Sequence, residues 1–111
     1  MLHVLIALIM TFFWNEARAE SVADFYKNKQ INIVVGYGTG GAYDLYARLL
    51  SRYMGQNIPG HPKIIVQNMP GAGGVRAMEY LATQAPKDGT WIGAFASGPL
   101  LDPVIGARKP P

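Results

Sequence analysis

The sequence predicts an α/β fold built as a parallel β-α-β-α-β unit. Three short segments with the pattern of strands, Ile31–Val35, Lys63–Gln67 and Thr90–Ala96, alternate with two segments of helical period, Leu45–Met54 and Val75–Ala85. Each predicted strand is followed by a turn that contains glycine. Strands that alternate with helices through short connections form parallel sheets with right-handed crossovers. The three turns are therefore expected at the carboxyl edge of the sheet, where open α/β folds bind ligands.

The first strand is rich in β-branched residues and shows no alternation with polar ones, which is typical of a strand buried on both faces. The segment 20–30 before it predicts a short helical or irregular lead-in. Gly55 is a plausible C-terminal stop for the first helix. The segment Gln56–Pro62 contains two prolines and a glycine and is predicted to be a loop.

Large apolar side chains recur every fourth residue along the first predicted helix: Leu45 and Leu49, and Tyr46, Leu50 and Met54. This spacing predicts the apolar stripe of an amphipathic helix, the side that such a helix turns to the core. Tyr46, Tyr53 and Tyr80 are most simply explained by helix packing. Asp44 and Arg48 are also four residues apart and are predicted to pair on the opposite side.

The second helix is predicted to turn one face to the core, with Met78, Leu81, Ala82 and Ala85. The segment Pro86–Gly89 has the composition of a turn before the third strand. A further turn, Ser97–Pro99, follows that strand, and Leu100–Ile105 is predicted to begin another helix that Pro103 interrupts.

Composition excludes several classes of function. The 111 residues are half apolar and carry a net charge of +3 without a run of Lys or Arg, so no nucleic-acid footprint is present. The absence of cysteine excludes disulfides and thiol chemistry. His61 is the only histidine after residue 19, so we expect no metal site. The sequence offers no Ser-His-Asp set or paired catalytic carboxylates, and we expect no enzyme activity and no cofactor.

The first 19 residues have the pattern of a secretory signal peptide. An apolar run, Val4–Trp14, is followed by polar residues and by Ala17-Arg18-Ala19, with small residues where signal peptidase needs them. The run is too short to span a bilayer, which takes about 20 residues. Cleavage after Ala19 would send the chain to the periplasm or beyond. An amphipathic or buried N-terminal helix is the alternative.

Residues 20–111 supply three strands and two helices, which make a thin core with an open edge. We expect them to be the N-terminal part of a larger domain, in a truncated product or half of a two-domain protein. A complete minimal domain is the alternative.

The turn after the first strand, Gly36–Asp44, and the turn Pro70–Gly74 have the same chemistry. Glycine admits close approach, and the first turn of a helix has unpaired N–H groups at the positive end of its dipole. The N–H groups of Gly40–Ala42 and Gly73–Val75 are therefore predicted to form a shared seat for an anion. Tight turns without a ligand are the alternative.

The first turn also satisfies G-x-G-x-x-G through Gly36, Gly38 and Gly41, which is the pattern of dinucleotide-binding folds. Those folds need an acidic residue about 20 positions later for the ribose. No Asp or Glu occurs between Asp44 and Glu79, so an enzyme domain of the nucleotide-binding type is the weaker alternative.

Four motifs in order resemble one family: Gly40-Gly41 with Asp44, then Asn68–Gly74, Ala85–Thr90 and Ser97–Pro99. They look like the N-terminal part of the receptors of tripartite tricarboxylate transporters, the extracytoplasmic solute-binding proteins also called Bug or TctC-like proteins. The resemblance runs from about Phe25 to about Gly106.

The resemblance implies a periplasmic-binding-protein-like fold in which two α/β domains are hinged around a cleft. Such receptors capture a small organic carboxylate and deliver it to the membrane permease subunits of an ion-coupled transporter. We expect a monomer, and we expect this chain to hold part of the first domain only. A remnant that no longer binds is therefore another alternative.

Carried over from the family, the ligand-binding residues are Tyr37, Thr39, Gly40, Gly41 and Asp44, then Gly71, Ala72, Gly73 and Gly74, then Ser97 and Gly98. Thr39 and Ser97 can donate hydroxyl hydrogen bonds, and the ring of Tyr37 can wall the pocket. The Asp44 carboxylate would repel an anion, so we favour a helix-capping role, with a contact to a bridging water or ligand donor as the alternative. Arg76 could offer a charge to a ligand carboxylate or could be solvated.

The sequence departs from the family pattern in the first turn. Family members usually have proline and an aromatic residue before the double glycine, whereas here Gly36 and Gly38 flank Tyr37. Tyr43 replaces the small hydroxyl residue that is common just before the Asp. These changes alter the lining of the pocket and leave the identity of the ligand open.

Overall fold

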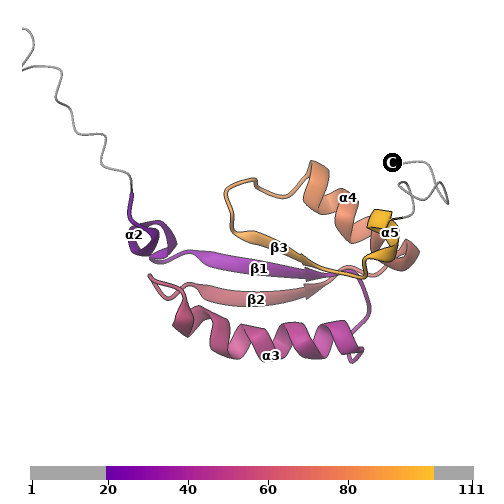
Figure 1. Ribbon diagram of the computed structural model, residues 1–111, viewed down its shortest axis with the longest axis horizontal. Helices are drawn as coiled ribbons and strands as arrows, with labels where there is room; N and C mark the ends of the chain where they lie inside the picture. Colours follow the sequence, from indigo (N-terminus) through magenta and orange to yellow (C-terminus); the bar gives the residue numbers. More distant parts are fainter. Residues whose placement is uncertain (1–19, 102–111) are drawn as a thin grey trace, which may run out of the picture.

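The computed structural model describes residues 20–101 of the chain (Figure 1). In chain order the elements are α2 (Val22–Tyr26), β1 (Gln30–Val35), α3 (Ala42–Asn57), β2 (Lys63–Asn68), the 3₁₀ turn η1 (Ala72–Gly74), α4 (Val75–Thr83), β3 (Trp91–Ala94) and α5 (Gly98–Leu101). The predicted signal peptide and the predicted continuation of a helix to Ile105 lie outside the described residues.

The three strands form one parallel sheet in the order β2-β1-β3. At the carboxyl end of β1, Val35 pairs with Asn68 of β2 and with Ala94 of β3, so the three strands end level with one another. The predicted β-α-β-α-β unit with parallel strands is therefore confirmed. The central strand is the most buried element: every residue of β1 after Gln30 is buried, as the apolar run predicts.

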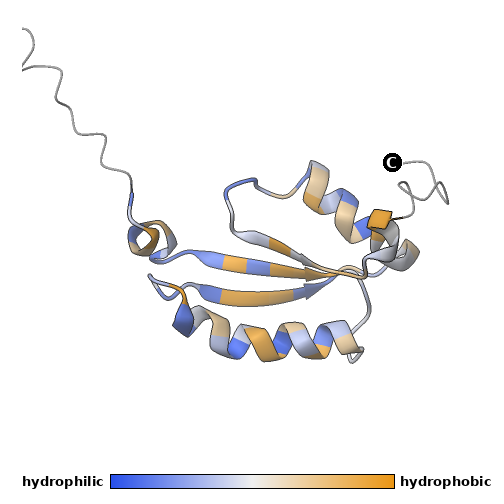
Figure 2. Ribbon diagram, viewed as in Figure 1, coloured by the Kyte–Doolittle hydropathy of each residue, from blue (hydrophilic) through white to orange (hydrophobic). Residues whose placement is uncertain are grey.

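The two long helices cover opposite faces of the sheet (Figure 1). On one face, Ile33 and Val35 form the core with Ala47 of α3. On the other face, Gly93 lies against Leu81 of α4, since an added Cβ at Gly93 would stand 2.7 Å from the Leu81 Cδ1 atom. The orange bands of the hydropathy colouring run along β1 and β2, in the middle layer (Figure 2).

Helix α3 is longer at both ends than predicted. It begins at Ala42 and continues through Gly55 to Asn57, so the predicted stop at Gly55 is wrong. An added Cβ at Gly55 would lie 2.5 Å from the Pro62 carbonyl oxygen. The glycine therefore allows the loop before β2 to pass close to the helix.

The predicted orientation of α3 is also wrong for most of the apolar stripe. Met54 is half-buried and packs against the core, but the other members of the stripe do not. The buried residues of the helix are Asp44 and Ala47, whereas Leu45, Tyr46, Leu49 and Leu50 are exposed by 52–68%. The small side chain of Ala47, 2% exposed, allows α3 to approach β1 closely. Asp44, predicted on the side away from the apolar stripe, turns inward because its carboxylate bonds to groups at the edge of the sheet.

The predicted core face of α4 is correct in part. Met78 and Leu81 are half-buried and Ala85 is buried, but Ala82 is exposed. Ala77, which the prediction omitted, is completely buried. The third strand is shorter than predicted and ends at Ala94.

Candidate functional site

Three loops meet at the carboxyl edge of the sheet: the first loop (Gly36–Gly41), the second loop (Met69–Gly74) and the third loop (Phe95–Ser97). Sheet hydrogen bonding extends into their first residues. The Gly36 N–H donates to the Ala94 carbonyl at 3.0 Å, and the Met69 N–H donates to the Val35 carbonyl at 2.7 Å. The loops therefore start side by side, where the topology predicts them.

The first and second loops touch through two glycines. A Cβ added to Gly36 would lie 2.9 Å from the Gly74 Cα atom and 3.2 Å from the Phe95 Cβ atom. Gly74 itself has a φ of +100°, which favours glycine. This contact requires two residues without side chains, so the glycines bring the two backbones together before any ligand is considered.

Tyr37 connects all three loops. Its hydroxyl donates to the Gly73 carbonyl oxygen at 3.2 Å and accepts the Ala96 N–H at 3.2 Å. Its ring stacks on the ring of Tyr43, with centroids 4.9 Å apart and planes inclined by 24°. Tyr37 thus has a structural role in addition to any role as a pocket wall.

Asp44 is the buried centre of a polar network at the start of α3. One carboxylate oxygen accepts the Gly40 N–H and the Arg48 Nε–H, each at 2.9 Å, and the other accepts an Asn68 amide hydrogen at 2.9 Å. The predicted pair of Asp44 and Arg48 is present. The helix N-cap is Gly41, and Asp44 stands three residues later, where it reaches back to fix the first loop.

The network stabilises the ionised form of Asp44. The hydrogen bond from Arg48, then those from the Gly40 N–H and from Asn68, hold the pKa of this carboxyl well below its usual range. Only 3% of the Asp44 side chain is exposed, against 46% for Arg48. The negative charge is therefore directed into the protein and neutralised there.

Asn68 is the part of the network that sequence reasoning did not assign. Its amide nitrogen donates to Asp44 and, at 3.1 Å, to the Tyr37 carbonyl, while its oxygen accepts from Arg48 at 3.0 Å. A carboxamide at the end of β2, directly before the second loop, was the available signal. In this position it ties β2 to the first loop and to α3.

The second loop has an unusual backbone. All four residues from Gly71 to Gly74 have positive φ, including Ala72 at +47°. The turn uses some of its own donors, since the Gly74 N–H bonds to the Gly71 carbonyl and the Val75 N–H to the Ala72 carbonyl. Those two N–H groups, which the sequence predicted to face an anion, are engaged within the loop.

Other donors along this edge have no partner within residues 20–101. They are the N–H groups of Gly41, Ala42 and Gly73 and the hydroxyls of Thr39 and Ser97. The residues that carry these donors are exposed. Gly98, the last predicted site residue, begins α5 directly after Ser97. The structure thus brings the predicted residues of all three loops to one edge.

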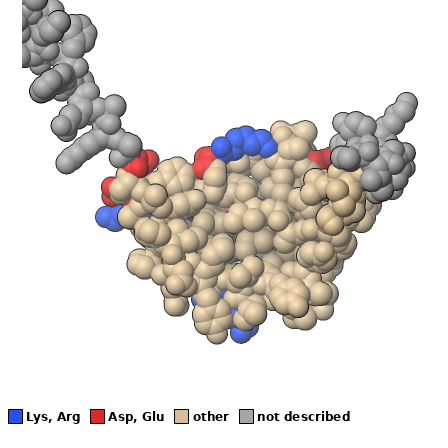
Figure 3. Space-filling model, viewed as in Figure 1, with Lys and Arg blue, Asp and Glu red and all other residues tan. Residues whose placement is uncertain are grey.

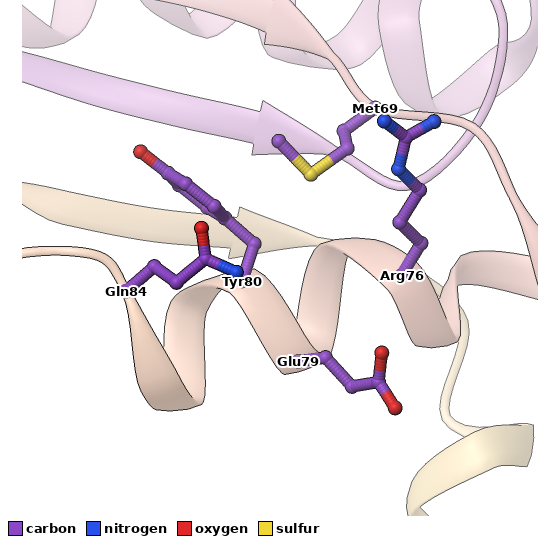
Figure 4. Close-up of a pocket in the computed structure, with 5 residues that line it drawn as sticks. All are labelled: Met69, Arg76, Glu79, Tyr80 and Gln84. Atoms are coloured by element: carbon purple, nitrogen blue, oxygen red, sulfur yellow. The ribbon is translucent and has the colours of Figure 1, made fainter.

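A separate pocket of about 460 Å³ lies between the second loop and α4, lined by Met69, Arg76, Glu79, Tyr80 and Gln84 (Figure 4). The stem of Arg76 packs against Gly71, 3.2 Å from the position of an added Cβ. Its guanidinium lies beside Met69, whereas Glu79 points away from it (Figure 4). Arg76 is thus beside the second loop.

Residues 20–101 lack two features that would suggest other functions. This part of the chain contains no cluster of three or more His, Cys, Asp or Glu side chains that could hold a metal ion. It also contains no helix with the length and apolar character needed to cross a membrane.

Comparison with known proteins identifies relatives that are much longer. The chain is 34% identical over 105 residues to a UPF0065 protein in the tcbD-tcbE intergenic region of Pseudomonas sp. strain P51, which is 95% of this chain and 30% of that protein. It is 36% identical over 97 residues to Protein BugT of Bordetella pertussis, covering 86% of this chain and 29% of BugT. A UPF0065 protein in the gbd 5' region of Cupriavidus necator is 38% identical over 68 residues, 61% of this chain and 20% of that protein.

No protein-family model matches the chain. The chain spans less than a third of the length of these relatives. Their names nevertheless agree with the family that the glycine motifs resemble, and the fold agrees with part of one α/β domain. These matches support the Bug family, the UPF0065 proteins, as the family of this chain, which spans only part of such a protein.

Proposed function

We propose that the three loops bind a small organic carboxylate, as part of a periplasmic receptor that delivers it to the permease subunits of a tripartite tricarboxylate-type, ion-coupled transporter. Family membership and the donors along the loop edge support this proposal. The signal-like residues 1–19, with cleavage after Ala19, support export. In this proposal the protein is a binding protein and not an enzyme, and a second lobe closes over the ligand.

The observation that carries the proposal is the direction of the Asp44 charge. An anion seat needs donors that point outward and no unpaired negative charge nearby. Asp44 is the only acidic residue of the three loops and the first turn of α3, and both of its oxygens accept bonds from inside the protein. The donors on the exposed residues of this edge would therefore meet a ligand carboxylate without repulsion from Asp44.

Each predicted site residue has a proposed role. The N–H groups of Gly41 and Gly73 and the hydroxyls of Thr39 and Ser97 would contact the carboxylate. Tyr37 would wall the site. The remaining residues would shape the backbone around it, with Asp44 as a positioning residue: Gly40, Gly71, Ala72, Gly74, Gly98 and Asp44.

Two alternatives to carboxylate binding predict different properties for the loops. A dinucleotide-binding enzyme needs a free acidic side chain after β2, but Asn68 stands there and is bonded to Asp44 and Tyr37. A remnant without binding activity would keep the loops and give no response to carboxylates.

The proposal can be tested by titrating the isotopically labelled chain with succinate and citrate while following backbone amide resonances by NMR. This method detects the weak binding expected of one wall of a cleft. We expect saturable shifts at Gly41, Ala42 and Gly73. In Gly73→Val these shifts should disappear, because a β-branched residue cannot adopt the φ of +66° without strain.

Gly38→Ala is the matched control, because no heavy atom lies within 4 Å of an added Cβ there and its φ is not positive. This variant should bind as the parent does. Thermal unfolding of both variants separates loss of binding from loss of folding. Absence of shifts in the folded parent chain, or equal shifts in folded Gly73→Val, would refute the assignment of the seat.

A further inference from the structure

Tyr43 places an aromatic ring over the loop edge. It is the second residue of α3, which begins at Ala42, and its ring stacks on the ring of Tyr37 with centroids 4.9 Å apart and planes inclined by 24°. The hydroxyl of Tyr37 is bonded to Gly73 and to Ala96, so Tyr37 lies across all three loops. The ring of Tyr43 therefore extends from the start of α3 over the carboxyl edge of the sheet.

This ring is supported on one side and open on the other. Tyr37 is half-buried, and an added Cβ at Gly74 would lie 3.7 Å from its hydroxyl oxygen, which is ordinary contact. Tyr43 is 40% exposed, and within residues 20–101 no second aromatic ring and no cation lies against it. A ring held in this way offers a flat apolar surface on which another ring can stack.

The open ring belongs to the same turn of helix as the free donors of the proposed anion seat. The N–H groups of Gly41 and Ala42 have no partner within residues 20–101, and they lie at the positive end of the helix dipole. Neighbouring Cα atoms are about 3.8 Å apart, so a carboxylate on these N–H groups leaves the rest of a small ligand within reach of the Tyr43 ring.

The loop edge offers little positive charge to a ligand. The three loops contain no Lys or Arg, and Arg48 is bonded to Asp44 and Asn68, which leaves Arg76 beside the second loop. On the face that Figure 3 shows, the surface around the start of α3, at the lower right, is uncharged. A polyanion gains few ionic contacts in such a site. A ligand with one carboxylate and an aromatic ring uses both the N–H groups and the open ring of Tyr43.

We propose that Tyr43 determines the class of ligand by stacking on it, and that the ligand is an aromatic carboxylate. This inference rests on the proposed carboxylate site and goes beyond it by naming the ligand class. The carboxylate contacts the N–H groups of Gly41 and Gly73, and the ligand ring lies against the open face of Tyr43, with centroids about 4.5–7 Å apart.

The first test compares benzoate with cyclohexanecarboxylate, each titrated into the isotopically labelled chain while backbone amide resonances are followed by NMR. Both ligands have one carboxylate and a six-carbon ring, but only benzoate has a flat π-system. We expect benzoate to bind roughly two- to tenfold more tightly, which is the effect of one aromatic pair beyond the burial of its area.

Substitutions at Tyr43 should change this preference in a defined way. Tyr43→Leu should abolish it, because leucine keeps an apolar side chain but has no ring. Tyr43→Phe should keep it, because stacking does not use the hydroxyl. Tyr46→Leu is the matched control, since Tyr46 is a 68% exposed tyrosine on the same helix, and this variant should keep the preference as well. Thermal unfolding of each variant shows whether it is folded.

The second test uses only the parent chain, so it does not depend on how the variants fold. Nuclear Overhauser effects should connect the ring protons of bound benzoate with those of Tyr43. The benzoate protons should also move upfield, because they would lie over the face of an aromatic ring.

The outcomes distinguish this inference from the proposed function. Shifts at Gly41 and Gly73 that are as strong with cyclohexanecarboxylate as with benzoate would overturn the aromatic class and leave the carboxylate site in place. A preference for benzoate that survives in folded Tyr43→Leu, or Overhauser effects to another ring only, would also overturn the inference. Absence of shifts with every carboxylate in the folded chain would refute both proposals.

Discussion

The hydroxyl of Tyr37 lies 3.2 Å from the carbonyl oxygen of Gly73, so a side chain of the first loop is bonded to the backbone of the second. The same hydroxyl accepts the Ala96 N–H of the third loop. Together with the close contact of Gly36 and Gly74, these bonds hold the loop edge in one arrangement without a ligand. A preformed site avoids the cost of ordering loops on binding.

Tyr37→Phe should loosen this edge. The substitution keeps the ring and its stacking on Tyr43 but removes both hydroxyl hydrogen bonds. We expect a loss of roughly 1 kcal/mol in the free energy of unfolding, or about 4–8 °C in the midpoint of thermal unfolding. Tyr43→Phe is the control and should change little, since its hydroxyl makes no hydrogen bond within residues 20–101. Equal midpoints of thermal unfolding for both variants would contradict the role of the Tyr37 hydroxyl in connecting the three loops.

Gly36→Ala should lower the free energy of unfolding, although it adds only one methyl group. The new Cβ would stand 2.9 Å from the Gly74 Cα atom, which is backbone and cannot rotate away. Overpacking of this kind typically costs 1–3 kcal/mol, and urea denaturation of the variant should show a loss of about that size. Gly38→Ala, in open space two residues later, should lose less than about 1 kcal/mol. A Gly36→Ala variant as stable as Gly38→Ala would show that the loops are not in tight contact.

Ala72→Gly should stabilise the protein. Ala72 adopts a φ of +47°, which costs a non-glycine residue roughly 1–2 kcal/mol, whereas glycine adopts it freely. Glycine also makes the unfolded chain more flexible, which lowers the free energy of unfolding by about 0.5–1 kcal/mol and offsets part of the relieved strain. We therefore expect a rise of a few degrees in the midpoint of thermal unfolding, measured by calorimetry. A lower midpoint would mean that the alanine methyl group makes contacts worth more than the strain.

The topology of the fold and the place of the loops could be predicted from sequence because they depend on local patterns. Apolar runs of strand length, glycine turns and helical periods follow one another in β-α-β order, and parallel strands then place every loop at one edge. The pairing of Asp44 with Arg48 was predictable for the same reason, since it depends only on spacing along one helix.

The orientation of α3 could not be predicted, because helical period identifies a stripe but not what covers it. The apolar stripe was the obvious candidate for the core. A long-range network with Asn68 and Gly40, together with the small Ala47, instead turns the polar side of the helix toward the sheet. The sequence also could not show that the N–H groups of Gly74 and Val75 bond to carbonyls within the second loop. These bonds depend on the positive φ values of that loop.

Asp44→Asn should lower the midpoint of thermal unfolding by roughly 5–10 °C near pH 7. The neutral amide keeps the shape of the side chain but loses the charge that Arg48 and the Gly40 N–H recognise. Asn68 would also face an altered partner. Glu79→Gln, at an exposed position on α4, is the control for removing one negative charge and should change the midpoint little.

The effect of Asp44→Asn should also depend on pH in a defined direction. The pKa of Asp44 is held below its ordinary value of 3.8 in the folded chain, so the unfolded chain takes up the proton first as the pH falls. The stability that Asp44 contributes is therefore complete above about pH 5 and is lost progressively below it. The difference in midpoint between the parent chain and Asp44→Asn should be largest from pH 6 to 7 and should shrink toward pH 3.

Only this difference reports on Asp44, because other carboxyls also titrate in acid. The hydrogen bonds from Thr90 hold the pKa of Asp88 below its ordinary value, and this group destabilises both proteins equally as the pH falls. The measurement is a series of thermal unfolding curves for both proteins from pH 7 to pH 3. A difference that stays constant over this range would mean that the ionised carboxylate of Asp44 does not hold the first loop to α3, and the proposed inward direction of its charge would then no longer support an anion seat.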